Sequence, residues 1–204
     1  MSTRGVAAAS APLRPAVCLG RRDQTPGAVG GDTSYVAGIR EPKPSRPYMP
    51  GYGIRPADEG SGLLPWSWAE EQLQASHNFW VVTLWPDGRP HAMPVWGVWD
   101  DSDLFWFTSA VRSRKALNIA NDPRCSVATE DEQHPVVLEG EGHIRTANAE
   151  IAHVLEFVNA KYGTNYGMEM MDPAEQATIR IRPRWAFALD ADDFTGSPTR
   201  WTFA

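Results

Sequence analysis

Apolar and β-branched residues recur in short runs from about residue 65 onward, and each run has the length of one strand. These runs cover residues 79–85, 91–99, 104–108, 125–129, 135–145, 178–182 and 185–189. Pro86-Asp-Gly-Arg89 has the composition of a hairpin turn, so the first three runs are predicted to form a meander of neighbouring strands. Pro94 is predicted to break the ladder of the second strand, because proline has no N–H to donate.

Three short helices are predicted between the strands. The first follows Ser67-Trp-Ala-Glu70, which has the pattern of a capping box. The second covers residues 116–121 and ends at Asp122-Pro123. Asn148 is predicted to cap the third, whose apolar face is formed by Ile151, Val154, Leu155 and Val158. Gly163 is predicted to end it in a left-handed conformation.

Six or seven short strands with three small helices indicate a mainly β fold, a compact β-barrel with helical decoration. Gly140 and Gly142 suggest a bulge in the fifth strand. Residues 194–203 are predicted to be a C-terminal tail. A doubly wound α/β fold is not expected, because it needs longer helices that alternate with the strands.

The chain before residue 65 has a different composition. Residues 1–46 are rich in Ala, Pro, Gly, Ser and Arg without periodicity, so we expect a disordered tail. They lack the apolar core of about 7–15 residues that a signal peptide requires. Residues 47–64 are also rich in Gly and Pro, but they contain aromatic and apolar residues that an isolated loop would expose to solvent. They are therefore predicted to be an extended arm on the folded body or on a partner subunit. The barrel domain is placed at 65–204.

Composition limits the partners. The net charge is −6 and the pI about 5.4, so nucleic acid and anionic membranes are not expected as partners. No apolar run approaches the roughly 20 residues of a membrane span. Cys18 and Cys125 are far apart in unlike contexts, which favours a reducing, cytoplasmic location over a disulfide framework. The five histidines show no metal-ligand spacing, and no metal site is expected.

A cluster of cations and hydroxyls stands out against this acidic background. The apolar run 104–107 leads into it, and it lies at the start of the predicted helix 116–121. Its members are Thr108, Ser109, Arg112, Ser113, Arg114 and Lys115. Cations at a helix start oppose the helix dipole by a few tenths of a kcal/mol, and a bound phosphate reverses the sign of that interaction. The cluster therefore predicts a phosphorylated ligand.

Trp96 follows the strand that Pro94 is predicted to break. Such a strand leaves backbone N–H and C=O groups free to bond a planar heterocycle, so the pattern fits a flavin-sized ligand. No Gly-rich nucleotide loop and no Gly-x-Ser-x-Gly motif is present.

Residues 77–99, Phe107-Thr-Ser109 and Ser113-Arg-Lys-Ala-Leu-Asn-Ile-Ala-Asn-Asp-Pro-Arg124 resemble the pyridoxamine 5′-phosphate oxidase-like family. The resemblance covers about residues 64–203, and is nearest to actinobacterial members that use FMN or the deazaflavin coenzyme F-420. It implies an FMN-binding type of split β-barrel, and a homodimer with the cofactor at the subunit interface.

The resemblance, with the cation cluster, places the cofactor against a set of residues from four parts of the chain. They are Met93, Pro94, Val95, Trp96, Phe107, Thr108, Ser109, Arg112, Ser113, Arg114, Lys115, Val136 and Trp201, with Val137 beside Val136 and with Trp185 and Arg200 beside Trp201 from the partner chain. No catalytic side chain is assigned, and solvent or His91 is expected to supply a proton.

Two departures from the family pattern bear on function. The loop before Ser113 is one residue longer and carries Arg112, which favours F-420 over FMN. The basic C-terminal segment that binds the substrate phosphate is not recognisable, so vitamin B6 oxidation is not expected. The sequence predicts an oxidoreductase that reduces a small conjugated acceptor. The alternative is a non-catalytic protein that binds flavin, deazaflavin or haem on the same barrel.

Overall fold

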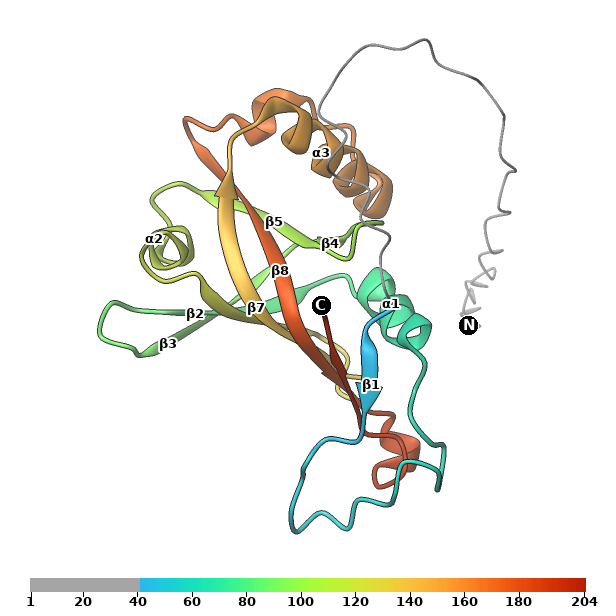
Figure 1. Cartoon of the computed structure of the whole chain (residues 1–204). Helices are drawn as coiled ribbons and strands as arrows, with labels where there is room; N and C mark the ends of the chain where they lie inside the picture. Colours follow the sequence, from blue (N-terminus) through green and yellow to red (C-terminus); the bar gives the residue numbers. More distant parts are fainter. Residues whose placement is uncertain (1–40) are drawn as a thin grey trace, which may run out of the picture. The chain divides into compact units, whose positions relative to one another are not determined.

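The computed structural model describes residues 41–204, which form a curved antiparallel sheet with three α-helices (Figure 1). The strands are β1 (Lys43–Ser45), β2 (Phe79–Leu84), β3 (Pro90–Val95), β4 (Val98–Trp99), β5 (Phe105–Ala110), β6 (Arg124–Thr129), β7 (Val136–Arg145), β8 (Gln176–Ala188) and β9 (Thr199–Thr202). The helices are α1 (Trp66–Ala75), α2 (Arg114–Asn121) and α3 (Asn148–Tyr162), with short 3-10 helices η1 (Met168–Met171) and η2 (Ala191–Asp193). The predicted mainly β fold is confirmed.

The strands follow the order β1-β9-β8-β7-β6-β2-β3, and β5 pairs with both β4 and β8. The predicted meander of the first three barrel strands is therefore wrong in part. β2 and β3 form the expected hairpin, but β5 pairs with β8, about 70 residues further along the chain, and not with β3. As a result β3 forms one edge of the sheet among the described strands.

Pro94 does not break β3, because an edge strand tolerates a residue without an N–H. The strand ends instead at Val95, just before Trp96. β8 is likewise one strand where two were predicted. Its Pro183 lies opposite Gly140, where the register of β7 and β8 shifts, so the ladder absorbs the proline. The predicted bulge at Gly140 is confirmed.

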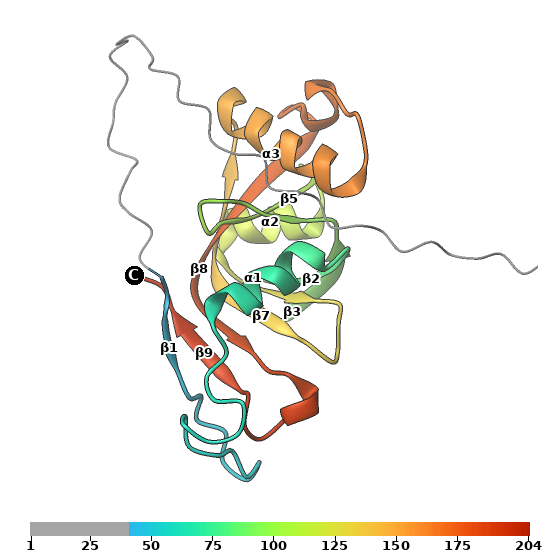
Figure 2. The same cartoon turned by 90° about the vertical axis from the view of Figure 1, so that its right-hand side faces the viewer.

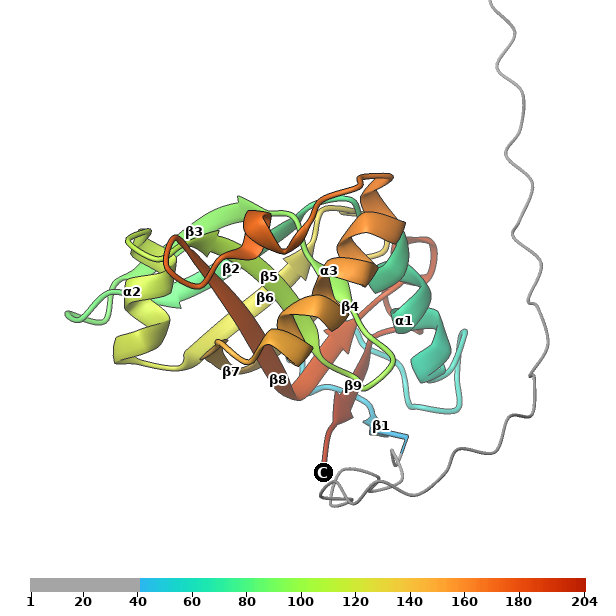
Figure 3. The ribbon, with the colours of Figure 1, turned by 90° about the horizontal axis from the view of Figure 1, so that it is seen from above.

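The helices lie where they were predicted, but two caps differ. α1 begins at Trp66, one residue before Ser67, and no side chain caps it, so the predicted capping box is wrong. Asn148 is the first residue of α3 rather than its cap. Gly163 ends α3 with φ of 64°, as predicted. Seen from above, α2 lies at the end of the body opposite α1 (Figure 3).

The C-terminal residues predicted to be a tail contain β9, which pairs with β8 on one side and β1 on the other (Figure 2). β1 falls within residues 1–46, the predicted disordered tail; residues 1–40 of that tail lie outside the described part of the chain. The predicted arm, 47–64, has no strand or helix and is bound to its own subunit. Arg55 pairs with Asp193, and the Leu64 N–H donates to Thr199 Oγ1 at 2.8 Å.

Two apolar clusters hold this body together. The larger lies between α1, α2 and the concave sheet. In it, Trp66 of α1 makes edge-to-face contacts with Trp99, Trp201 and Phe203. The smaller packs Trp106 beneath α3. Within residues 41–204, no helix has the length and hydropathy needed to cross a membrane.

Gly140→Ala is expected to destabilise the fold by about 1–3 kcal/mol, because the added Cβ would clash with the backbone carbonyl of Arg182 across the bulge. Urea denaturation of the purified variant measures this loss. Gly142→Ala is the matched control: its nearest neighbour, Ile119 Cδ1 at 3.0 Å, ends a flexible side chain and yields more easily. Equal losses in the two variants would contradict the steric account.

Candidate functional site

The end of β5 and the start of α2 are joined by their hydroxyl groups. Ser113 is the N-cap of α2, and its Oγ accepts a hydrogen bond from the Ala116 N–H at 3.3 Å. Ser109 Oγ lies 2.9 Å from the same oxygen, and the Ser113 N–H donates to the carbonyl of Ala110 at 2.8 Å. The strand-to-helix turn is therefore fixed locally, and the helix N–H groups face the same region as the side chains around it.

The three predicted cations gather at this turn. Arg112 is exposed, whereas Arg114 and Lys115 are partly buried. None of the ion pairs among residues 41–204 includes any of the three. Burial lowers the pKa of Lys115, because the protonated amine loses hydration without gaining a carboxylate. An anion bound at this position would supply the missing countercharge.

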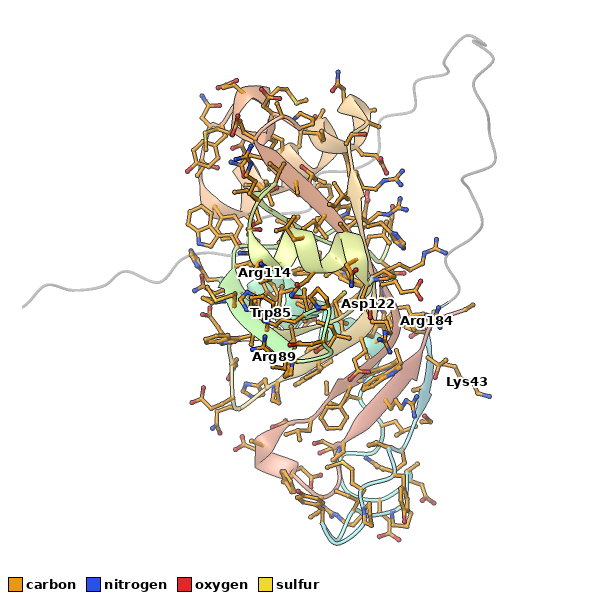
Figure 4. All side chains as sticks on the ribbon, turned by 90° about the vertical axis from the view of Figure 1, so that its left-hand side faces the viewer. Lys43, Trp85, Arg89, Arg114, Asp122 and Arg184 are labelled. Carbon is orange, nitrogen blue, oxygen red and sulfur yellow. The ribbon has the colours of Figure 1, made fainter. Side chains whose placement is uncertain are left out.

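Trp85 links this turn to the β2–β3 hairpin. The Arg114 guanidinium stacks over its ring at 4.0 Å from the centroid, and the Arg89 guanidinium lies 5.0 Å from the same centroid (Figure 4). Arg89 also pairs with Asp87 at 2.8 Å. Sequence reasoning treated Trp85 as a strand residue and missed this contact. No local pattern signals it, because the hairpin and α2 are brought together only by the fold.

The free edge of β3 begins at this hairpin and runs away from it. Its prolines lack an N–H, and an edge strand accommodates them with their nitrogens facing away from the neighbouring strand. The backbone groups that point away from β2 are therefore those of Pro90, Ala92 and Pro94. They present three carbonyls and one N–H, that of Ala92. Met93, on the other side of the pleat, is 41% exposed. The edge thus offers polar backbone groups beside apolar side chains.

Trp96 follows this edge but lies at its far end from the cations. Its indole stacks on Tyr162 of α3, with centroids 4.4 Å apart and planes 5° apart. Lys161 is half-buried beside it, donating to the carbonyls of Gly97 at 3.1 Å and Leu73 at 3.3 Å. The predicted site residues therefore do not gather at one point: the cations lie near the start of β3, and Trp96 lies beyond its end.

Four predicted cofactor residues have side chains in the core. Val95 is 8% exposed and Phe107 2%, and Val136 and Trp201 are 0% exposed. The Trp201 ring packs against Trp66 in the core of its own subunit, and its contact with a cofactor from the partner chain stays a prediction. The Val136 N–H already donates to Thr129 Oγ1 at 2.9 Å. These residues shape the barrel beneath the site and do not line its surface.

Thr108 lies on the opposite face of β5 from Phe107 and pairs with Thr178 of β8. The hydroxyl oxygens of both threonines are buried without a hydrogen-bond partner among the described residues. Ser109, one residue further along β5, directs its hydroxyl to Ser113 in the cation cluster.

Asp100, Asp101 and His153 have atoms close enough together to bind a metal ion. The oxygens of Asp100 already accept from the N–H groups of Ser102 and Leu104 and from Trp106 Nε1, the last at 2.7 Å. The Asp100 carboxylate therefore stabilises the turn between β4 and β5 and fixes the Trp106 indole beneath α3. The absence of a metal site stays a prediction.

Two hollows of about 240 Å³ lie away from the cation cluster. One is lined by the carboxylates of Glu41, Glu70 and Asp103 beside Trp66. The other contains Cys125 and Trp185. Burial raises the pKa of Cys125 to about 12, so its thiol is unreactive at neutral pH. The cation cluster and the β3 edge line neither hollow.

The sequence model of the family described as pyridoxamine 5′-phosphate oxidase matches residues 68–190. The chain belongs to this family. The family binds flavins and includes flavin-dependent oxidoreductases. The match spans β2 to β8 and therefore includes the β3 edge, the cation cluster and α2.

The fold is also that of solved split β-barrels at low sequence identity. A conserved hypothetical protein from Mycobacterium tuberculosis has a TM-score of 0.58 at 24% identity, with 64% of this chain and 87% of that chain covered. A protein of unknown function from Agrobacterium tumefaciens gives 0.52 at 19%, covering 60% and 55%. ChuZ from Campylobacter jejuni gives 0.56 at 10%, covering 67% and 60%. A search of curated proteins finds no match.

The stability of the fold is expected to rise with pH between about 8 and 10.5. Burial lowers the pKa of Lys161 to about 8, against the effect of Glu130, while the unfolded chain titrates near 10.5. Between these values the unfolded chain binds the additional proton, so deprotonation favours the folded state. Lys161→Met removes this titration, and urea denaturation across the range should show a weaker rise. An unchanged rise in the variant would contradict the assignment.

Proposed function

We propose that this protein is an oxidoreductase that binds FMN or coenzyme F-420 and transfers a hydride to a small conjugated acceptor. The observation that carries the proposal is the set of cations that have no carboxylate partner among residues 41–204, at the Ser113-capped start of α2 and beside β3, an edge of the described sheet. Membership of a flavin-binding family supports the same conclusion.

The phosphate of the cofactor would be held by Ser113, Arg114 and Lys115. The hydroxyl and the N–H groups at the helix start donate to phosphate oxygens, and the two cations neutralise them. Lys115 gains most, because burial has already removed part of the hydration of its amine. Arg114 is held in place by its stacking on Trp85.

The ring of the cofactor would lie along the β3 edge, where Ala92 and the outward carbonyls can bond its polar atoms. When bound, the isoalloxazine or deazaflavin ring supplies the hydride chemistry, and the protein supplies position and shelter from water. We assign no catalytic side chain. His91, 5.9 Å from Trp85 between ring centroids, and solvent are the candidate proton sources.

Arg112 and Arg89 favour F-420 over FMN. Together with Arg114 and Lys115 they place four cations around Trp85 and the start of α2, although Asp87 offsets one of them. A single phosphate needs fewer, whereas the phosphodiester and carboxylates of F-420 extend further. Parallel titrations with the two cofactors decide between them.

A homodimer that completes the site also belongs to the proposal. The cation cluster and the β3 edge are open surface on one subunit, so a second wall must come from elsewhere to exclude water. Trp185 and Arg200 are suited to supply part of it, because they lie on the outward face of β8 and β9 with the guanidinium 5.0 Å from the indole centroid. Light scattering of the purified protein should give twice the mass of one chain.

Lys115→Ala is expected to weaken binding of the preferred cofactor by about 1.5–3 kcal/mol, through loss of a charge-assisted phosphate contact. Cofactor fluorescence during titration measures the dissociation constant. Lys43→Ala is the control, since it removes the same charge from the exposed strand β1, away from the cluster (Figure 4). Unchanged affinity in folded Lys115→Ala would refute the phosphate site.

Turnover separates the enzyme from its non-catalytic alternative. Reduced cofactor is mixed with the protein and a panel of enones, quinones and tetrapyrroles, and reoxidation is followed by absorbance. Reoxidation that depends on both protein and acceptor supports the oxidoreductase. Tight cofactor binding without turnover of any acceptor would instead identify a binding protein.

A further inference from the structure

Trp96 combines high exposure with a rigid support. Its side chain is 46% exposed, although one face of the indole is covered by the parallel ring of Tyr162. The edge of the His77 ring meets it at 5.8 Å between centroids, with the planes at 88°. One indole face is therefore fixed against protein, and the rest is open to solvent. An exposed aromatic ring held in this way has little conformational freedom to lose when a ligand stacks on it.

The support behind Trp96 is itself fixed by hydrogen bonds. Tyr162 Oη accepts from the Gly97 N–H at 2.8 Å and lies 2.9 Å from the carbonyls of both His77 and Gly97. Lys161 donates to the same Gly97 carbonyl. Tyr162 and Lys161, at the end of α3, thus hold the backbone of Gly97 by hydrogen bonds. Because Gly97 directly follows Trp96, these bonds also fix the position of the indole relative to β3.

The position of Trp96 along β3 separates it from the anion site. His91 lies beside Trp85 and the cations, and five residues of extended chain lead from it to Trp96, about 17 Å at about 3.3 Å per residue. A cofactor with its phosphate at α2 would place its ring along this edge. Trp96 would then lie at the far end of the ring, where a second molecule could meet it.

We propose that Trp96 is the stacking surface for the acceptor, and that it selects planar conjugated molecules such as naphthoquinones. This inference rests on the proposed function and deepens it. It also reassigns Trp96 from the cofactor to the substrate. The acceptor would lie with one face on the exposed indole and would reach toward the cofactor ring. In turnover a quinone takes up a hydride from the reduced cofactor and a proton from solvent and becomes the hydroquinone.

Apolar chemistry at this end of β3 favours an uncharged planar acceptor. The nearest cation, Lys161, directs its protons to two backbone carbonyls, and the Tyr162 hydroxyl is occupied by backbone groups. The indole face and the neighbouring His77 ring remain as the contact surface. Stacking of a flat ring on an aromatic side chain contributes about 1–3 kcal/mol, which converts to roughly 5- to 150-fold in affinity.

The test compares Trp96→Leu with Phe194→Leu in the full-length protein. Phe194 is an exposed aromatic residue of similar accessibility, 41%, near η2 and away from β3. Equilibrium binding of menadione to the oxidised, cofactor-loaded protein is measured by fluorescence quenching, and turnover is measured with menadione and with 2-cyclohexenone, a hydride acceptor that has no aromatic ring to stack.

We expect Trp96→Leu to weaken menadione binding and its kcat/KM by about 10-fold or more, within the range that stacking provides. Turnover of 2-cyclohexenone, cofactor affinity and all properties of Phe194→Leu should stay unchanged, and Trp96→Phe should restore part of the effect. Menadione affinity unchanged in Trp96→Leu would overturn the proposal. A fall in cofactor affinity like that of Lys115→Ala would also overturn it, because Trp96 would then contact the cofactor.

The two proposals fail in different ways. If the unaltered protein binds neither FMN nor F-420, the proposed function fails, and menadione binding by the cofactor-free protein still reports on Trp96. If the cofactor binds and Trp96→Leu changes nothing, only the acceptor surface is refuted.

Discussion

The pairing of β5 with β8 controls the arrangement of the site. By pairing there, β5 closes the sheet on the side of β8 and leaves β3 without a second neighbour among the described strands. The chain leaving β5 must then turn back toward β6, and α2 makes this connection across the end of the β2–β3 hairpin. One long-range pairing therefore creates a free strand edge and brings a helix start to it. The chain belongs to a family that binds flavins, and a free strand edge beside a helix start is consistent with such binding.

Electrostatics and packing act at opposite ends of that edge. At the α2 end, Arg114 and Lys115 are held close to a helix start without carboxylates to neutralise them, which is unfavourable until an anion binds. At the α3 end, Tyr162 and Lys161 satisfy the backbone around Gly97 and leave an indole exposed. The two ends therefore suit two different molecules, an anionic one at the start of α2 and an uncharged planar one on the indole.

Features set by neighbouring residues could be predicted from the sequence. The hairpin at Pro86-Asp-Gly-Arg89, the bulge at Gly140 and the left-handed Gly163 follow from local backbone chemistry, and so does the cation cluster. Features set by long-range pairing could not. The partner of β5, the placement of β9 and the stacking of Arg114 on Trp85 depend on contacts between distant segments. Trp201 shows the same limit, because the resemblance suggested a contact with the cofactor and only the fold shows that its strand buries the side chain.

The prolines of β3 have a consequence for the colloidal behaviour of the protein. A strand edge kept open for a ligand is also a template on which a strand of another molecule can add. With Pro90 and Pro94 in the outward row, Ala92 offers its single N–H there, so an incoming strand cannot form a continuous ladder. The same two residues thus leave the carbonyls of the edge accessible to a small molecule while protecting the protein against edge-to-edge aggregation.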